Sequence, residues 1–295
     1  MSKLYCLNAG KADCFLLELT DEKGIHYILV DGGSRENPVN EIPSYLKEKG
    51  IEKIDGIILT HLHQDHLGSL DAVAEDVRVE WAVLPYPPIP LSEEEMAGIQ
   101  DGERIKDIRS YNRLWELLVK KGCRIDTTLP LTVSAYQYGS YELRCLYPFP
   151  DTVSNVYAML CRLQREEPVR AKSMYDSVRT LFNKDSSIWL LKKDNRPILI
   201  LCGDAVHASL AAAVGGYGIK VPIIKLSHHG RNDKGNLYYQ SMFIESLEPE
   251  KIIITSDLVS AEPFMQEWET MRERCGAREL IITGIYEKDR VLELP

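Results

Sequence analysis

The chain has 295 residues, 44% of them hydrophobic and 27% charged, so it can form one large domain or two small ones with a sizeable core. Its 35 Lys and Arg residues against 44 Asp and Glu residues give a net charge of −9, which argues against a protein that binds nucleic acid through a large basic face. The apolar runs are far shorter than the roughly 20 residues of a membrane span, and the first residues lack a signal-peptide pattern. The seven cysteines, none in CxxC spacing, indicate free thiols in a reducing compartment, so we expect a cytoplasmic protein.

The first part of the chain is rich in predicted strands. Residues 3–8, 14–19 and 25–31 have short apolar patterns separated by turn residues, and residues 39–49 are predicted to form a helix. The continuous apolar run 54–60 predicts a strand buried on both faces. Helices and strands alternate later, an order that suits sheets packed on each other with helices outside. The remaining predicted strands are 80–84, 132–138, 141–147, 187–193, 197–202, 221–227, 251–255, 279–283 and 290–294, and the helices are 103–121, 151–182, 205–214, 236–247 and 263–275.

Three histidines and one aspartate follow directly after the buried strand 54–60. They are His61, His63, Asp65 and His66, in the sequence His-Leu-His-Gln-Asp-His. A turn that leaves a strand can point His61 and His63 at one ion, and the next helical turn can present Asp65 and His66 to a neighbouring ion. Imidazole suits zinc and other transition metals, and carboxylate suits harder ions. This spacing therefore predicts a metal site.

Two predicted strands later in the chain also end in residues that can bind a metal. The apolar strand 197–202 is followed by Asp204, and the strand 221–227 is followed by His228 and His229. Five of the seven histidines thus follow two apolar strands. Because strand ends hold side chains on a rigid sheet, we expect these residues to complete the same site.

The pattern His-x-His-x-Asp-His, followed at a distance by Gly-Asp and by paired histidines, resembles the metallo-β-lactamase-fold superfamily of metal-dependent hydrolases. It implies an α/β (α+β) fold, an αββα sandwich of two mixed β-sheets flanked by helices. It also implies a single domain over residues 1–295, with insertions near 86–121 and 150–180 that cover the site and set the substrate. The closer resemblance is to the hydrolase domain of the ComEC-type competence proteins, in the segments 8–14, 30–33, 183–189 and 226–230.

The resemblance assigns metal-binding roles to the first motif. It implies that His61 and His63 bind one ion, that Asp65 and His66 bind a second, and that Asp204 bridges the two. The ions are expected to be two Zn²⁺, with Mn²⁺ as an alternative. A water held between them would be the nucleophile, because two ions lower its pKa and neutralise the oxyanion that develops.

The paired histidines and two carboxylates take the remaining roles. The resemblance implies that one histidine of the pair completes the ligand set of the second ion. We assign His228 to the metal, and His229, together with Asp65, to proton transfer. The reverse assignment of the two histidines stays open. Asp31 ends the predicted strand 25–31, and the resemblance implies that it orients a histidine ligand.

Three positions depart from the pattern of the superfamily or of the ComEC branch. Asn183 stands where the superfamily usually has another histidine ligand, so the first ion is expected to be held loosely. Glu262 precedes a proline where the ComEC branch has His-Pro; it is either a ligand or base, or a helix N-terminal residue, which we favour. Arg231 replaces a serine after His-His-Gly; it either holds a phosphate bidentately, with Lys184 as a weaker candidate, or is a surface arginine.

Three functions remain open from the sequence. The leading hypothesis is a metal-dependent phosphodiesterase, either a nuclease that acts on single-stranded nucleic acid or a hydrolase of a small phosphodiester. The second is a thioester or lactone hydrolase, in which the same metals activate water against a carbonyl. The third is a non-catalytic metal-binding subunit that interacts with a protein partner in a larger assembly. No membrane partner is expected.

Overall fold

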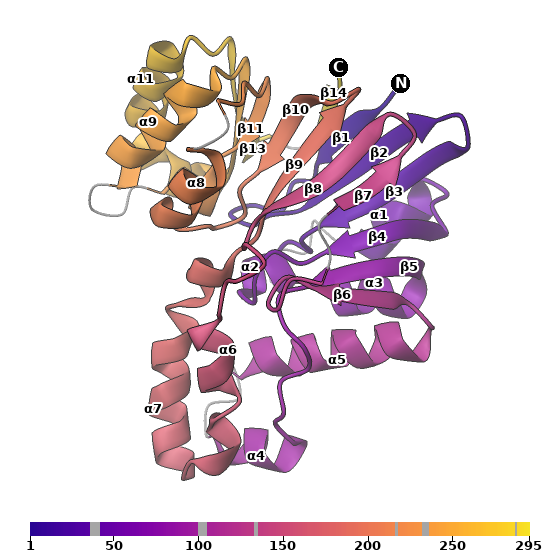
Figure 1. Cartoon of the computed structure of the whole chain (residues 1–295), viewed down its shortest axis with the longest axis vertical. Helices are drawn as coiled ribbons and strands as arrows, with labels where there is room; N and C mark the ends of the chain where they lie inside the picture. Colours follow the sequence, from indigo (N-terminus) through magenta and orange to yellow (C-terminus); the bar gives the residue numbers. More distant parts are fainter. Residues whose placement is uncertain (36–41, 100–104, 133–134, 216–217, 232–235, 287) are drawn as a thin grey trace.

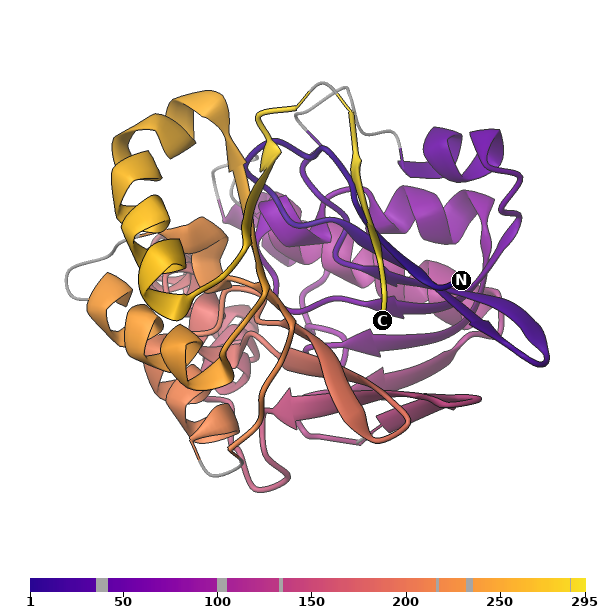
Figure 2. The same ribbon diagram turned by 90° about the horizontal axis from the view of Figure 1, so that it is seen from above.

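In the computed structural model, two β-sheets pack face to face and helices cover the outer face of each, so the expected αββα sandwich is confirmed (Figure 1). Seen from above, the N-terminal and the C-terminal helices lie on opposite sides of the sheets (Figure 2). The structure describes residues 1–35, 42–99, 105–132, 135–215, 218–231, 236–286 and 288–295.

The first sheet is built mainly from the N-terminal part of the chain and has the strand order β14-β1-β2-β3-β4-β5-β6. The pairs from β14 to β3 are antiparallel, whereas β3, β4, β5 and β6 run parallel. β14 pairs with β1, and this brings the two termini close together (Figure 2). The strands are β1 Lys3–Cys6, β2 Phe15–Asp21, β3 Gly24–Val30, β4 Lys53–Ile58, β5 Arg78–Leu84, β6 Arg124–Thr127 and β14 Arg290–Glu293.

The second sheet has the strand order β13-β12-β11-β10-β9-β8-β7. Strands β10 to β13 run parallel, and β7 to β10 are antiparallel. The parallel strands carry continuous apolar runs because helices and the first sheet cover both of their faces. The strands are β7 Ala135–Tyr138, β8 Tyr141–Tyr147, β9 Ile188–Lys193, β10 Arg196–Leu201, β11 Ile223–Lys225, β12 Lys251–Asp257 and β13 Glu279–Gly284.

Helices cover the outer faces of both sheets through separate apolar cores. Apolar side chains of α1, α3 and α5 pack on the first sheet, and those of α8, α9 and α11 pack on the second. Helices α4, α6 and α7 extend from α5 away from the sheets (Figure 1). The α-helices are α1 Ile42–Glu48, α2 Gln64–Leu67, α3 Leu70–Asp76, α4 Glu93–Gly98, α5 Lys106–Lys120, α6 Asn155–Leu160, α7 Pro168–Arg179, α8 His207–Val214, α9 Asn236–Leu247, α10 Leu258–Ala261 and α11 Met265–Cys275. The 3₁₀ turns are η1 Leu163–Arg165, η2 Phe182–Asp185, η3 Ser227–Gly230 and η4 Glu262–Phe264.

A third apolar core lies between the two sheets. Trp81 of β5 stacks on Tyr136 of β7, with ring centroids 3.6 Å apart, and donates a hydrogen bond to the Tyr138 hydroxyl at 2.7 Å. Gly56 of β4 lies beside Trp81, and a Cβ at this position would meet the indole ring at 2.1 Å. The strand tyrosines Tyr136 and Tyr138 therefore fill the space between the sheets.

Most predicted elements are present, with differences at the shorter ones. The prediction lacked β6 and α3, and the long helix predicted over 151–182 is divided into α6, η1 and α7. The predicted helix 39–49 is present as α1, and its first three residues lie outside the described part of the chain. Within that part, no helix has the length and apolar character needed to cross a membrane.

Candidate metal centre

The predicted ligands meet where the parallel strands of both sheets end. In the first sheet, β3 is followed by Asp31 and β4 by the segment 60–66. In the second sheet, β10 is followed by Asp204 and β11 by His228 and His229. The carboxyl ends of parallel strands are the usual position of binding sites in α/β proteins.

Tight backbone packing shapes the loop that carries the first motif. His63 precedes the short helix α2, and the carbonyl oxygen of His66 accepts a hydrogen bond from the N–H of Gly32 at 2.5 Å. Gly68 ends α2 with φ of +32°, and a Cβ there would lie 2.1 Å from the carbonyl oxygen of Gly33. Only glycine permits this approach, which joins the two loops of the first sheet.

His61, His63 and Asp204 form a first group, whose potential ligand atoms lie within 4.8 Å of one another. Nε2 of His61 is 3.0 Å from Nδ1 of His63 and 3.9 Å from Oδ2 of Asp204. Nε2 of His63 lies 3.0 Å from the main-chain oxygen of Arg179, to which it donates a hydrogen bond. This bond leaves Nδ1 of His63 available to a metal.

A second group forms around His66 and His229. Nε2 of His66 lies 3.2 Å from Oδ1 of Asp204. Nε2 of His229 lies 3.1 Å from Oδ2 of Asp65 and 3.7 Å from Oδ2 of Asp204. Asp204 therefore faces both groups, with His61, His66 and His229 all within 4 Å of its carboxylate.

The Nδ1 sides of the two buried histidines are held by other residues. Nδ1 of His66 donates to Oδ2 of Asp31 at 2.8 Å, and Asp31 also accepts 2.8 Å hydrogen bonds from the N–H and the hydroxyl of Thr60. Nδ1 of His229 lies 2.9 Å from the hydroxyl of Thr255. These contacts orient both rings and leave their Nε2 atoms facing Asp204.

We expect the variant Asp31→Asn to weaken metal binding by about 10–100-fold, because His66 loses the carboxylate that orients its ring. The dissociation constant is measured by competition with a chelating indicator. Asp31 has a left-handed φ of 59°, which asparagine also adopts, so the backbone should be retained. The matched control is Asp55→Asn, since Asp55 forms a similar 3.0 Å contact with Nδ1 of His26 outside the metal centre. Equal affinities in both variants and the natural chain would contradict the role of Asp31.

Asp13 and Lys225 belong to this centre although the motif analysis assigned them no role. Asp13 lies 3.7 Å from Nδ1 of His66 and 3.4 Å from Nδ1 of His229. Its carboxylate pairs with the buried Lys225 ammonium and accepts a 2.5 Å hydrogen bond from Thr255. Because Asp13 lies on the Nδ1 side of both rings and already has these partners, we interpret it as a support behind the ligands.

Buried negative charge exceeds buried positive charge in this cluster. Asp13, Asp31 and Asp204 are at most 2% exposed, and Lys225 is the buried ammonium that faces them. One more carboxylate, that of Asp65, has a side chain that is 37% exposed. Buried charges are costly unless they are compensated, so the cluster favours additional cations.

The pKa shifts of the histidines agree with this charge balance. Burial alone would lower the pKa of His66, but the neighbouring carboxylates, Asp204 foremost, hold it well above its usual range. At His229, burial again lowers the pKa, but the neighbouring carboxylates outweigh it and raise the pKa to about 9. Burial keeps the pKa of His61 well below its usual value, so this ring stays in the neutral form that binds metals. Carboxylates that stabilise a proton on imidazole also stabilise a metal cation.

Unpartnered buried atoms show that the side chains fit a metal. Nε2 of His66, Oδ1 of Asp204 and Oδ1 of Asn183 are buried and have no hydrogen-bond partner among the described residues. Such atoms are rare in folded proteins and call for an explanation such as a bound ion. Imidazole nitrogens and carboxylate oxygens are the donors that zinc and similar divalent ions take.

The paired histidines lie differently although both adopt left-handed backbone conformations, with φ of 50° for His228 and 53° for His229. His229 is buried, whereas the side chain of His228 is 20% exposed and its Nε2 lies 3.9 Å from Oδ2 of Asp204. The geometry therefore favours His229 as the ligand and His228 as the residue at the entrance. This is the alternative assignment that the sequence left open.

The remaining candidates lie on loops around the centre. Asn183 and Lys184 are in η2, where Lys184 is exposed and its main-chain oxygen accepts a hydrogen bond from Tyr147. Arg231 is exposed directly after η3, and its N–H donates to the main-chain oxygen of His228 at 2.8 Å. Glu262 is exposed at the start of η4.

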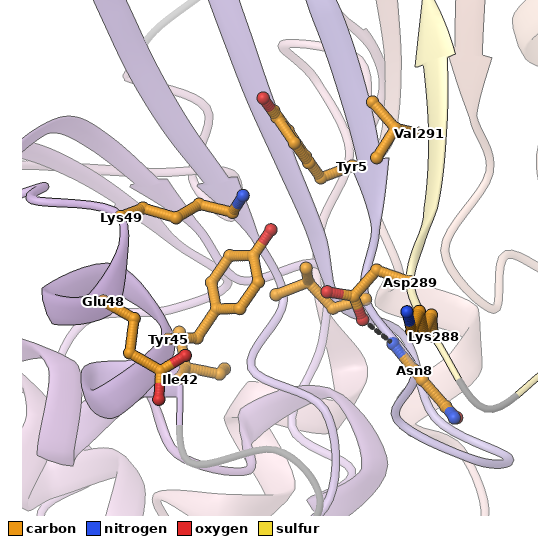
Figure 3. A pocket seen from close by; sticks show the side chains of 10 residues that line it. Tyr5, Asn8, Ile42, Tyr45, Glu48, Lys49, Lys288, Asp289 and Val291 are labelled. Carbon is orange, nitrogen blue, oxygen red and sulfur yellow. Dashed lines mark hydrogen bonds between the residues drawn. The ribbon is translucent and has the colours of Figure 1, made fainter.

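A hollow of about 400 Å³ lies between α1, β1 and the segment before β14 (Figure 3). The ammonium of Lys49 lies over the rings of Tyr5 and Tyr45, at 4.9 and 5.0 Å from their centroids. Asp289 on the opposite wall accepts a hydrogen bond from the main-chain N–H of Asn8 at 2.8 Å. The lining of this hollow contains none of the metal-centre residues, so the hollow is separate from the candidate metal centre.

The comparisons with known proteins agree with the fold and the motif. Residues 7–122 match the family model described as the metallo-beta-lactamase superfamily, a segment that includes His61, His63, Asp65 and His66. Among solved structures, the chain is similar to Igni18, described as a novel metallo hydrolase from the hyperthermophilic archaeon Ignicoccus hospitalis KIN4/I. The identity is 14% and the TM-score 0.52, over 100% of this chain and 99% of that chain. At this identity, the likeness concerns the fold alone.

Two further structures have lower scores. A diphosphatase from the PhnP family has 12% identity and a TM-score of 0.46 over 100% of this chain and 98% of that one. A metallo beta lactamase from Hirschia baltica has 12% identity and a TM-score of 0.31 over 91% and 86% of the two chains. No curated protein matches the sequence significantly.

Proposed function

We propose that this chain, whose residues 7–122 match the metallo-beta-lactamase superfamily, is a metal-dependent hydrolase of phosphodiester bonds. The observation that carries the proposal is the pair of His/Asp groups that share Asp204. Asp204 lies 3.9 Å from His61 and 3.2 Å from His66, and the facing atoms, Nε2 of His66 and Oδ1 of Asp204, have no hydrogen-bond partner among the described residues. A centre with two adjacent cation sites suits the cleavage of a substrate that is itself negatively charged.

We assign the ligands from the geometry. His61, His63 and Asp204 would hold one ion. Asn183, which follows the Phe182 that packs on His63, has a buried amide oxygen without a hydrogen-bond partner among the described residues and would complete this site. The second ion would be held by the buried His66 and His229, together with Asp65 and the shared Asp204. When bound, the ions would lower the pKa of water and neutralise the charge that develops on substrate oxygens.

Two residues at the entrance would take part in the reaction: Asp65 would orient the water, and His228 would donate a proton. In the metal-free chain, burial would raise the pKa of Asp65, but the hydrogen bond from His229 holds it well below its usual range. A bound cation would replace this donor and also favour the ionised carboxylate, so Asp65 would remain an acceptor that can orient water. His228 is half-buried beside Asp204 and would give a proton from its Nε2 to the leaving group. In this proposal, His228 takes the acid role that the sequence analysis assigned to His229.

The proposed substrate is a phosphodiester, and within this class a short or small one. A phosphodiester is supported by the cation-favouring centre and by the resemblance to the ComEC-type hydrolase domain. The net charge of −9 favours a short or small diester over long nucleic acid, because the chain lacks a bulk electrostatic attraction to a polyanion. A thioester or lactone hydrolase and a non-catalytic metal-binding subunit remain as outcomes of the test.

The test combines metal analysis with a substrate panel. Plasma mass spectrometry on chain purified without chelators is expected to find about two divalent ions per chain, and fewer in His61→Ala. His26→Ala is the control, since this ring pairs with Asp55 at 3.0 Å outside the centre. Loaded chain should hydrolyse bis(p-nitrophenyl) phosphate or thymidine dinucleotides, and a chelator should abolish this activity. Hydrolysis of thioesters alone would favour the second function, and a folded chain that binds no metal would contradict the catalytic proposal.

A further inference from the structure

Helix α7, which belongs to the second insertion, reaches the metal centre through its last residue. The main-chain oxygen of Arg179 accepts a hydrogen bond from Nε2 of His63 at 3.0 Å. Three residues later, the ring of Phe182 packs against the imidazole of His63, with centroids 5.3 Å apart. The insertion therefore does not merely lie near the centre, because it contacts one of the candidate ligands directly.

The side chain of Arg179 is held at one end of its guanidinium group. Its Nε donates to Oδ2 of Asp107 at 2.8 Å, and the hydroxyl of Tyr175 donates to the same oxygen at 3.2 Å. Asp107 is completely buried in α5, so this anchor is rigid. Its other oxygen, Oδ1, has no hydrogen-bond partner among the described residues. The two terminal nitrogens of Arg179 are thus not used in a bidentate pair with Asp107.

Arg179 also lines a hollow that it shares with the candidate ligand His63. This hollow of about 320 Å³ is lined by His63, Asp176, Arg179 and Thr180. The side chain of Arg179 is 39% exposed, and no hydrogen bond from its terminal nitrogens is found within the described ranges. Its positive charge also acts on the ligands. Burial chiefly, and the charge of Arg179 in addition, lower the pKa of His63.

We infer that Arg179 binds an anionic phosphate oxygen of the substrate and positions that substrate at the metal centre. This inference rests on the proposed function and names the residue that selects a phosphate over a neutral ester. The two terminal nitrogens along one edge of a planar guanidinium can donate hydrogen bonds to two phosphate oxygens at once. Asp107 would fix the orientation of the guanidinium, which reduces the conformational entropy lost on binding. Arg231 and Lys184, the residues expected from the sequence to hold the phosphate, are not needed for this role.

The first experiment measures binding rather than turnover. Isothermal titration of metal-loaded chain with inorganic phosphate is expected to give a dissociation constant about tenfold or more higher for Arg179→Gln than for the natural chain. Arg179→Lys should recover part of the affinity, because it keeps the charge but not the paired donors. Metal content should stay unchanged, since the main-chain oxygen that contacts His63 is retained. Arg170→Gln is the matched control, because Arg170 lies on the same helix, is 78% exposed and pairs with Glu166 at 3.0 Å.

Kinetics then locate the phosphate that Arg179 binds. With bis(p-nitrophenyl) phosphate, Arg179→Gln should raise KM more than it lowers kcat if the scissile phosphate is the one bound. If an adjacent phosphate is bound, the natural chain should prefer a thymidine dinucleotide with a 5′-phosphate over one without it, and Arg179→Gln should abolish the preference. Because Arg179→Gln leaves Asp107 buried without its partner, the double variant Asp107→Asn/Arg179→Gln provides a second test with no unpaired buried charge.

The outcomes separate this inference from the proposed function. Unchanged phosphate affinity and an unchanged KM in Arg179→Gln and in the double variant, with metal retained, would overturn the role of Arg179 while diester hydrolysis stands. A natural chain that binds metal and phosphate but cleaves no diester would contradict the proposed function, and the loss of phosphate binding in Arg179→Gln would still support the inference.

Discussion

The variant Asp204→Asn is expected to lose most of its bound metal and to hydrolyse diesters about a thousandfold more slowly, which corresponds to roughly 4 kcal/mol of lost transition-state stabilisation. The reason is geometric, because the Asp204 carboxylate is within 4 Å of His61, His66 and His229. Asparagine keeps the shape of the side chain but has one oxygen and no charge. It therefore cannot serve two ions at once.

Metal content and thermal unfolding distinguish this effect from a loss of folding. The metal-free variant is expected to be somewhat less stable than the metal-free natural chain, because ionised Asp204 pairs with His66 and His229, so the effect of metal on Tm is compared within each protein. Added zinc or manganese should raise the Tm of the natural chain much more than that of the variant. Asp194→Asn is the control, since Asp194 is exposed in the turn that precedes β10, at the opposite end of the same strand. Two ions retained in Asp204→Asn would contradict the shared-ligand assignment.

The sequence predicts those features of the centre that depend on residues adjacent in the chain. The segment 61–66 contains four candidate ligands within six residues, and the strands before Asp204 and His228 are recognisable apolar runs. Parallel strands end at a common edge, so the convergence of these segments follows from their order. The resemblance to a known family adds the bridging role of Asp204, which spacing alone does not imply.

The contacts that join distant segments could not be predicted in this way. Lys225 is one charged residue in an apolar strand, and nothing in the pattern shows that it faces Asp13, which lies 212 residues earlier. Arg179 belongs to a helix that was predicted, but its orientation depends on Asp107, 72 residues away. Strand β6 has the sequence Arg-Ile-Asp-Thr, which is too polar to indicate a strand without the neighbouring β5.

Replacing Lys225 with methionine is expected to lower the free energy of unfolding by about 3–5 kcal/mol, because a buried carboxylate loses its charge partner. Lys225 is completely buried, pairs with Asp13 and donates a 2.8 Å hydrogen bond to the main-chain oxygen of Gly203. Methionine fills a similar volume, so packing is largely retained. The loss is measured by urea unfolding in the presence of a chelator, which removes any contribution from bound metal.

The double variant Asp13→Asn/Lys225→Met separates the charge effect from the loss of the lysine itself. Removing both charges should recover most of the stability, because asparagine at position 13 can still accept the hydrogen bond from Thr255. Lys220→Met is the control, since Lys220 lies just before the same strand in an exposed pair with Glu248, and such pairs contribute at most about 1 kcal/mol. If the double variant is no more stable than Lys225→Met, the cost comes from the bond to Gly203. In that case Lys225 would support the turn that carries Asp204 rather than the charge balance behind the histidines.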